Sequence, residues 1–145
     1  MQPPLHAYAA AIPSFLAAAF RGEPLPVHGD GTQSRDFTYV STVVEVITDA
    51  LRRRVDHLEP VNLAFGTNVS LLEVISHLEG ILGRPLYREH LPSRVGDVSR
   101  SQADSSTLLG LFPDVRPTPL VEGLEATVRW FETARPWQRL SPGTG

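Results

Sequence analysis

The clearest hydrophobic pattern lies in residues 71–82, where apolar side chains recur at the three- and four-residue spacing of a helix with one buried face. Ser70 and Glu73 stand three residues apart at its start, which is the spacing of a capping box, and Gly83 follows its last apolar position. The apolar positions are Leu71, Val74, Ile75, Leu78, Ile81 and Leu82. We therefore predict a helix between Ser70 and Gly83.

Three further segments show helical spacing, namely residues 12–20, 43–54 and 119–131. Either Ser41 or Thr42 can cap the second segment, and Thr118 followed by Pro119 is typical of a helix start. Residues 105–110 fit one short helical turn. The chain is thus predicted to have about four helices.

Short strands are predicted between these helices. Residues 26–28, 61–64 and 86–90 are predicted to be short strands, and residues 35–40 alternate polar and apolar side chains as a half-buried strand does. Gly29 and Gly31 flank Asp30 in a turn that favours positive φ, which indicates a hairpin between the first two strands. The pattern predicts an α/β fold, an α+β-like small domain over residues 1–134 with a loose tail at 135–145.

Composition and charge exclude several classes of protein. The 145 residues suit one domain, and 41% hydrophobic with 20% charged residues is typical of a globular protein. A net charge of −3 argues against binding to nucleic acid or to an anionic membrane. There is no apolar run of about 20 residues and no pattern of a signal peptide. We expect a cytoplasmic protein without membrane contact.

The basic residues are all arginine, 13 in number, and the chain has no lysine and no cysteine. A Walker A lysine, a Schiff-base lysine, a Tyr-x-x-x-Lys pair and a thiolate metal site are therefore excluded within this chain. The five histidines are scattered without the spacing of metal ligands, so we expect no metal site. Recognition of an anion has to rely on arginine, whose guanidinium suits phosphate oxygens.

Two arginines in irregular polar stretches are candidates for such recognition. Arg35 is followed by Asp36, and Arg94 lies three residues before Asp97. If the two guanidinium groups converge, they suit a diphosphate. The alternative is that each arginine pairs with its own neighbouring acid. The Gly29-x-Gly31 segment is not a dinucleotide fingerprint, because Ser34 replaces the third glycine and a strand follows.

Longer segments resemble a known family. Residues 27–40 (VHGDGTQSRDFTYV) resemble the GDGxQxRDFxYV segment of extended short-chain dehydrogenases/reductases that act on nucleotide sugars. Residues 61–66, 69–73 and 94–104 resemble the family's N-I-G-x-G, x-S-I-x-E and R-x-G-D-V-x-x-S-x-A-D segments, and residues 120–124 its L-x-E-G-L segment. The similarity covers about residues 8–132 in the family's order. The chain thus resembles the NAD-dependent epimerase/dehydratase family, UDP-glucose 4-epimerase-like.

The resemblance implies roles for five residues. Arg35 and Arg94 would bind the pyrophosphate, Asp97 a ribose hydroxyl, Val27 would lie along the base, and Ser101 would lie close to the sugar. Tyr39 matches a structural aromatic residue of the family, and Thr42 replaces an aspartate that family members usually carry.

The same resemblance implies that this chain lacks the NAD-binding portion of the family. The family's Gly-rich NAD loop, catalytic Ser/Thr and Tyr-x-x-x-Lys pair have no counterpart here, so we expect the C-terminal substrate-binding part without the Rossmann half. We expect no catalytic residue and no cofactor in this chain, although full-length members use NAD.

The expected partners are a UDP-sugar or related nucleotide sugar, the missing Rossmann domain, and a second copy bound through an exposed apolar face. The nucleotide, the sugar and the choice among epimerase, dehydratase and decarboxylase stay open. The alternative function is that of a stand-alone binding or interaction module, or of a nonfunctional gene fragment.

Overall fold

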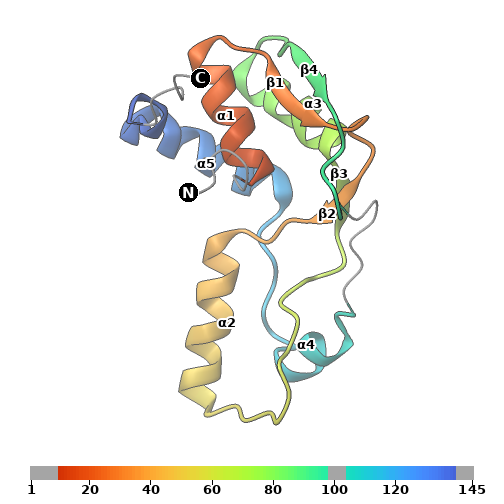
Figure 1. Ribbon diagram of the computed structural model, residues 1–145. Helices are drawn as coiled ribbons and strands as arrows, with labels where there is room; N and C mark the ends of the chain where they lie inside the picture. The colour runs from red at the N-terminus through yellow and green to blue at the C-terminus, as the bar shows by residue number, and fades with distance from the viewer. Residues whose placement is uncertain (1–9, 98–103, 140–145) are drawn as a thin grey trace.

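The computed structural model describes residues 10–97 and 104–139, which form two halves joined by three connecting segments (Figure 1). The upper half holds helices α1 (Ala11–Arg21), α3 (Leu71–Leu82) and α5 (Leu120–Ala134). The lower half holds α2 (Val40–Arg53) and α4 (Ser106–Leu111). The mixed α/β class is therefore confirmed, with five α-helices in the described residues instead of about four.

The upper half is built on a parallel pair of strands, β1 (Leu25–His28) and β4 (Arg88–Leu91), in which Val27 lies opposite His90. Helices α1, α3 and α5 enclose a core with these strands. Its fully buried large side chains are Phe15, Leu16, Leu25, Val27, Val74, Ile75 and Leu78. This core holds the strand ends from which the candidate site arises.

A second strand pair corrects the expected hairpin. Strand β2 (Ser34–Asp36) pairs antiparallel with β3 (Asn68–Ser70), whereas β1 pairs with β4. The turn between β1 and β2 does hold Gly29 and Gly31 at positive φ, 79° and 82°. It is tied to the start of α3, because the Leu72 N–H donates to the Gly31 carbonyl at 3.1 Å. This hydrogen bond positions the turn so that β2, which follows it, pairs with β3 and not with β1.

The expected strand at 35–40 is too long, since β2 ends at Asp36 and α2 begins at Val40 with Tyr39 as its N-cap. Neither Ser41 nor Thr42 caps this helix. Thr42 is instead fully buried, and its hydroxyl oxygen accepts the Thr118 N–H at 3.0 Å. The bond links α2 to the segment that leads into α5.

The predicted ends of helices α3 and α5 agree with the structure more closely than the predicted start of α2 does. Both hydrogen bonds of the predicted capping box are present, between Ser70 and Glu73, and Gly83 ends α3 with φ 69°. In α5 the N-cap is Pro119, one residue after the predicted Thr118. The capping pattern therefore located α3 more accurately than it located α5.

The lower half has its own apolar cluster, which is formed by buried side chains of α2, α4 and the chain after α4: Val46, Leu108, Phe112 and Val115. Val61, Leu63 and Phe65 pack against it. The predicted strand at 61–64 is not formed, because this extended segment has no strand beside it in the described part of the chain.

Part of the expected loose tail is packed against the upper half. A 3-10 helix, η2 (Pro136–Gln138), follows α5, and the Trp137 ring stacks on Phe20 of α1 with 4.4 Å between ring centroids. The Arg21 guanidinium donates to the Trp137 carbonyl at 2.8 Å. The remaining tail, residues 140–145, lies outside the described residues.

Candidate functional site

The candidate site lies where β2 meets the turn formed by residues 94–97. Arg35 projects from β2, and its guanidinium donates to the Asp97 carboxylate in an ion pair. The two side chains are 29% and 26% exposed, so a solute can reach the pair from one side. A second Arg35 nitrogen donates to the Ser34 carbonyl at 2.8 Å, which fixes the guanidinium along the strand.

The 94–97 turn brings the second arginine to the same edge. The Asp97 N–H donates to the Arg94 carbonyl at 3.1 Å, and Gly96 has φ 80°, a conformation that glycine adopts without strain. Arg94 is exposed. Because Asp97 pairs with Arg35, the structure brings Arg35 and the turn that carries Arg94 together, as the diphosphate hypothesis requires.

Two histidines link the ends of strands β1 and β4 to the loops that follow these strands. The His28 Nδ1 bonds the Pro92 carbonyl at 3.2 Å, and the His90 Nδ1 bonds the Gly29 carbonyl at 2.8 Å. A carbonyl only accepts, so each Nδ1 carries the proton in these hydrogen bonds. The first bond joins β1 to the chain after β4, and the second joins β4 to the chain after β1. Neither bond could be predicted from the sequence, because each joins residues more than 60 positions apart.

The acid next to Arg35 has a different role from the expected one. Asp36 accepts the Gly66 N–H at 2.8 Å and the Thr67 hydroxyl at 3.2 Å, so it holds the 66–67 turn against β2. The alternative in which Arg35 pairs with its own neighbour is therefore wrong. Arg35 pairs with the acid of the other loop, because β2 directs successive side chains to opposite faces.

Asp30, in the glycine turn, accepts the Thr32 N–H at 2.9 Å and the Thr32 hydroxyl at 2.6 Å. These hydrogen bonds, from the hydroxyl first, hold the pKa of Asp30 below its usual value. The carboxylate is therefore ionised near neutral pH and closes the turn on itself. It shapes the loop between β1 and Arg35.

Two other residues that the sequence analysis predicted to bind the ligand, Val27 and Ser101, are not seen at the surface of the candidate site. Val27 is 0% exposed in the core, so its side chain does not face a ligand in this structure, and a contact with a base would have to come from its backbone. Ser101 lies outside the described residues. No group of potential metal ligands occurs among the described residues, and none of their helices is long and apolar enough to span a membrane.

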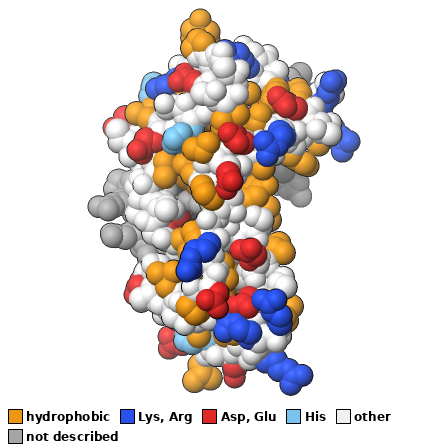
Figure 2. Space-filling model, turned by 180° about the vertical axis from the view of Figure 1, so that it is seen from behind, with side chains coloured by type: hydrophobic (Ala, Val, Ile, Leu, Met, Phe, Trp, Pro, Cys, Tyr) orange, Lys and Arg blue, Asp and Glu red, His pale blue; other side chains and the backbone are white. Residues whose placement is uncertain are grey.

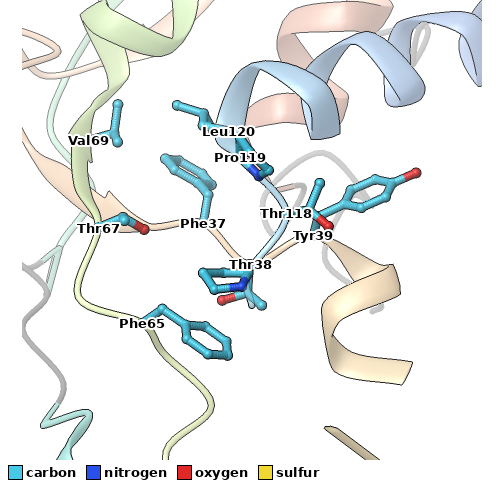
Figure 3. Close-up of a pocket in the computed structure, with 10 residues that line it drawn as sticks. Phe37, Thr38, Tyr39, Phe65, Thr67, Val69, Thr118, Pro119 and Leu120 are labelled. Atoms are coloured by element: carbon cyan, nitrogen blue, oxygen red, sulfur yellow. The ribbon is translucent and has the colours of Figure 1, made fainter. Parts of the chain in front are cut away.

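A small cavity lies elsewhere, at the junction of the two halves (Figure 3). Its volume is about 90 Å³, which is too small for a nucleotide. The three connecting segments line it with Phe37, Thr38, Tyr39, Phe65, Thr67, Val69, Pro117, Thr118, Pro119 and Leu120. None of the predicted site residues is among these, so the cavity and the candidate site are separate.

Tyr39, which lines this cavity, also contacts α5. A Cβ added at Gly123 would lie 3.2 Å from the Tyr39 ring, so glycine permits the ring to approach the helix. The aromatic residue thus packs the junction of the two halves. This placement agrees with the structural role expected from the sequence.

Acidic and basic side chains are mixed on one face of the molecule. Figure 2 shows acidic and basic side chains mixed over both halves of the face it presents. Such mixing suits the net charge of −3. On this face it offers no single-sign patch of the kind that nucleic-acid binding needs.

Comparison with known proteins points to one family. The NAD dependent epimerase/dehydratase family matches residues 3–64. A dTDP-4-dehydro-6-deoxy-D-allose reductase from a Streptomyces species is 38% identical over 121 residues, which are 83% of this chain and 36% of the reductase. A probable UDP-glucuronate 4-epimerase from Rhizobium meliloti is 32% identical over 138 residues, covering 81% of this chain and 40% of that protein.

A solved structure is similar in shape as well as in sequence. The UDP-glucuronic acid 4-epimerase from Bacillus cereus, in complex with UDP-glucuronic acid and NAD, superposes with a TM-score of 0.79 at 31% identity. The match covers 86% of this chain and 40% of the epimerase. Over most of its length, the chain is thus similar to members of the NAD dependent epimerase/dehydratase family. It spans two fifths or less of the length of these family members.

Proposed function

We propose that this chain is the C-terminal, nucleotide-sugar-binding portion of an NAD-dependent sugar epimerase or dehydratase. Arg35 and Arg94 bind the diphosphate, Asp97 binds a ribose hydroxyl, and Ser101 lies next to the sugar. The observation that carries the proposal is the meeting of Arg35 with the 94–97 turn at one accessible edge. Two guanidinium groups on separate elements match the two phosphates of a nucleoside diphosphate.

The relatives support this choice of ligand. Their names include UDP-glucuronate and a dTDP-linked sugar, and the Bacillus cereus epimerase holds UDP-glucuronic acid together with NAD. The ligands named for these relatives share a nucleoside diphosphate joined to a sugar. The proposal therefore names this group as what Arg35 and Arg94 recognise, with UDP as the first nucleotide to test.

In the proposed enzyme, a second portion would hold NAD, whose chemistry would be hydride transfer at the sugar, and would also supply the catalytic acid–base group. This chain fixes the diphosphate, which holds the sugar in a defined orientation toward the nicotinamide. Alone it has no catalytic residue, because no lysine can pair with a tyrosine. A cytoplasmic location is part of the same proposal.

The test is titration of the chain with UDP by isothermal calorimetry. We expect saturable binding that Arg35→Leu and Arg94→Leu each weaken at least tenfold, since each removes a charge-assisted contact. Arg88→Leu is the matched control, because Arg88 lies on β4 and pairs with Glu79 at 3.6 Å, away from the 94–97 turn. Titration with NAD is expected to give no saturable heat.

Far-UV circular dichroism accompanies each titration, to separate binding from folding. If Arg35→Leu unfolds the chain while Arg88→Leu does not, the Arg35–Asp97 pair is structural and the ligand role of Arg35 is wrong. Equal UDP affinity in all variants contradicts the site. A micromolar isotherm for NAD contradicts the assignment of the cofactor to a separate portion.

A further inference from the structure

The two segments that carry the candidate arginines start from neighbouring strand ends. Strands β1 and β4 lie side by side and parallel, so their carboxyl ends meet at the same edge of the sheet (Figure 1). The chain after β1 runs through the glycine turn to Arg35, and the chain after β4 reaches Arg94 three residues beyond Leu91. The distance between these two segments beyond the strand ends therefore decides how far apart the two guanidinium groups can lie.

Crossed hydrogen bonds from two histidines hold the segments together at this edge. The Gly29 N–H, just after β1, donates to the Leu91 carbonyl at 2.8 Å and continues the ladder of the two strands. The His90 Nδ1, on β4, donates to the carbonyl of the same Gly29 at 2.8 Å. The His28 Nδ1, on β1, donates to the Pro92 carbonyl at 3.2 Å. Each histidine thus belongs to one strand and bonds the chain that follows the other.

His28 stands at the centre of this arrangement, because it bonds both segments. Its carbonyl accepts the side-chain amide of Gln33, which lies two residues before Arg35. Its ring donates to the carbonyl of Pro92, which lies two residues before Arg94. A continuous chain of hydrogen bonds from Gln33 through His28 to Pro92 therefore connects the neighbourhood of one arginine to that of the other.

The close approach of the two segments also depends on Gly29. A Cβ at this position would lie 3.0 Å from the Ser93 hydroxyl oxygen, and the φ of 79° is one that other residues adopt only with strain. Contact at Gly29 therefore limits how near the segments can come, and the histidine bonds limit how far apart they can move. Ser93 directly precedes Arg94, so this spacing also places the 94–97 turn.

We propose that His28 and His90 are positioning residues that fix the spacing of Arg35 and Arg94 for a diphosphate. The inference rests on the proposed function for the ligand. A diphosphate gains from both arginines only when they can bind its two phosphates at once, and this gain is lost when the geometry does not allow it. A monophosphate needs one guanidinium and is less sensitive to the spacing. The histidines act through the segments that they bond, without contact with the ligand.

The test compares the affinities for UDP and UMP, measured by isothermal calorimetry on the full 145-residue chain. Removal of either crossed bond, in His28→Leu or in His90→Leu, is expected to weaken UDP binding about tenfold, because a fixed spacing lowers the entropy lost on binding. UMP binding is expected to change less than about twofold. The ratio of the two affinities therefore falls about fivefold or more, a change that a purely structural role would not produce.

Two further variants make the test specific to the Nδ1 bond. In His28→Asn the amide nitrogen is separated from Cβ by one carbon, as Nδ1 is in histidine, so the donor to the Pro92 carbonyl is kept. We expect this variant to retain the UDP-to-UMP ratio of the wild type within about twofold. His57→Leu is the matched control, since the His57 Nδ1 lies 2.8 Å from the Glu59 carbonyl in the loop after α2, at the far end of the lower half (Figure 1). It is expected to leave both affinities unchanged.

A lower ratio in the leucine variants, restored in His28→Asn, supports the positioning role. Equal weakening of UDP and UMP binding overturns it, as does UDP binding that the leucine variants leave unchanged or a ratio that His28→Asn does not restore. Loss of the folded circular dichroism spectrum in both leucine variants also overturns it, because the bonds are then structural. Failure of the proposed function gives a different result: the wild type binds no UDP, or Arg35→Leu and Arg94→Leu bind it as the wild type does.

Discussion

The hydroxyl of Thr42 joins the two halves of the molecule at the backbone of Thr118. It accepts the Thr118 N–H at 3.0 Å and donates to the Thr118 hydroxyl at 3.2 Å, and the Thr42 side chain is fully buried. The N–H concerned lies just before α5, so this single side chain connects the first turn of α2 with the start of α5.

Thr42→Val is therefore expected to lower the free energy of unfolding by about 1–3 kcal/mol, because valine keeps the shape and leaves the Thr118 N–H without a partner. Urea denaturation followed by circular dichroism measures the change. Thr48→Val, at an exposed position of the same helix, is the matched control and is expected to change stability by no more than about 0.5 kcal/mol. Equal effects of the two substitutions would show that the buried hydrogen bond has no special weight.

Gly31→Ala is expected to be more destabilising than Gly22→Ala. Both glycines have positive φ, 82° and 71°, so alanine is strained at either position. At Gly31 a Cβ would also lie 2.7 Å from a methyl carbon of Leu72, whereas nothing lies within 4 Å at Gly22. We expect a loss of about 1 kcal/mol at Gly22 and of about 2–4 kcal/mol at Gly31, where overpacking is added.

Thermal denaturation of the two glycine variants, scanned under identical conditions, provides the measurement. A Gly31→Ala protein as stable as the Gly22→Ala protein would mean that Leu72 moves aside without cost. In that case the close contact between the glycine turn and α3 does not fix the path from β1 to β2.

Trp137→Ala is expected to destabilise the upper half by about 2–4 kcal/mol. The substitution removes a large aromatic side chain that stacks on Phe20 at 4.4 Å and on Phe131 at 6.1 Å between ring centroids. Trp130→Ala is the control, since Trp130 is 56% exposed on α5 and loses less buried surface. The difference in urea midpoint between the two variants reports the docking of η2. Identical midpoints would indicate that η2 does not stabilise the upper half.

The elements that could be predicted from the sequence are those whose signals are local. Helix α3 has its cap, its stripe and its terminal glycine within the segment itself, and all three were found where expected. The strand at 61–64 was predicted on the same kind of pattern but is not formed, because a strand needs a partner and the described chain offers none there. Pairing is a property of two segments, and one segment's pattern does not reveal it.

In the candidate site too, single residues could be predicted from the sequence, whereas contacts between distant residues could not. Arg35 and Asp97 could be named from the sequence, but their pairing with each other could not, since 62 residues separate them and each has a nearer partner in the chain. The roles of His28, His90 and Asp36 were missed for the same reason. Each bonds a backbone group that lies at least 30 residues away.

The capping box of α3 predicts a dependence of stability on pH. The Glu73 carboxylate accepts the Ser70 N–H at 2.8 Å, and the hydrogen bonds from Ser70, the backbone one first, hold the pKa of Glu73 below its usual value. His77, one turn along the helix, favours the ionised form as well. A lowered folded-state pKa means that the stabilisation is complete above the unfolded value of about 4.3 and is lost as the pH falls through the folded value.

Glu73→Gln isolates this effect, because glutamine keeps an oxygen that accepts the Ser70 N–H and does not titrate. The difference in free energy of unfolding between wild type and Glu73→Gln is expected to shift against the wild type as the pH falls below the unfolded value of about 4.3, toward the lowered folded-state pKa of Glu73. Urea titrations at several pH values give this difference. Glu132→Gln, on the exposed side of α5, is the matched control for the general effect of removing a carboxylate. A difference that is constant with pH, or that follows the Glu132 control, would show that the charge of Glu73 contributes nothing to the cap.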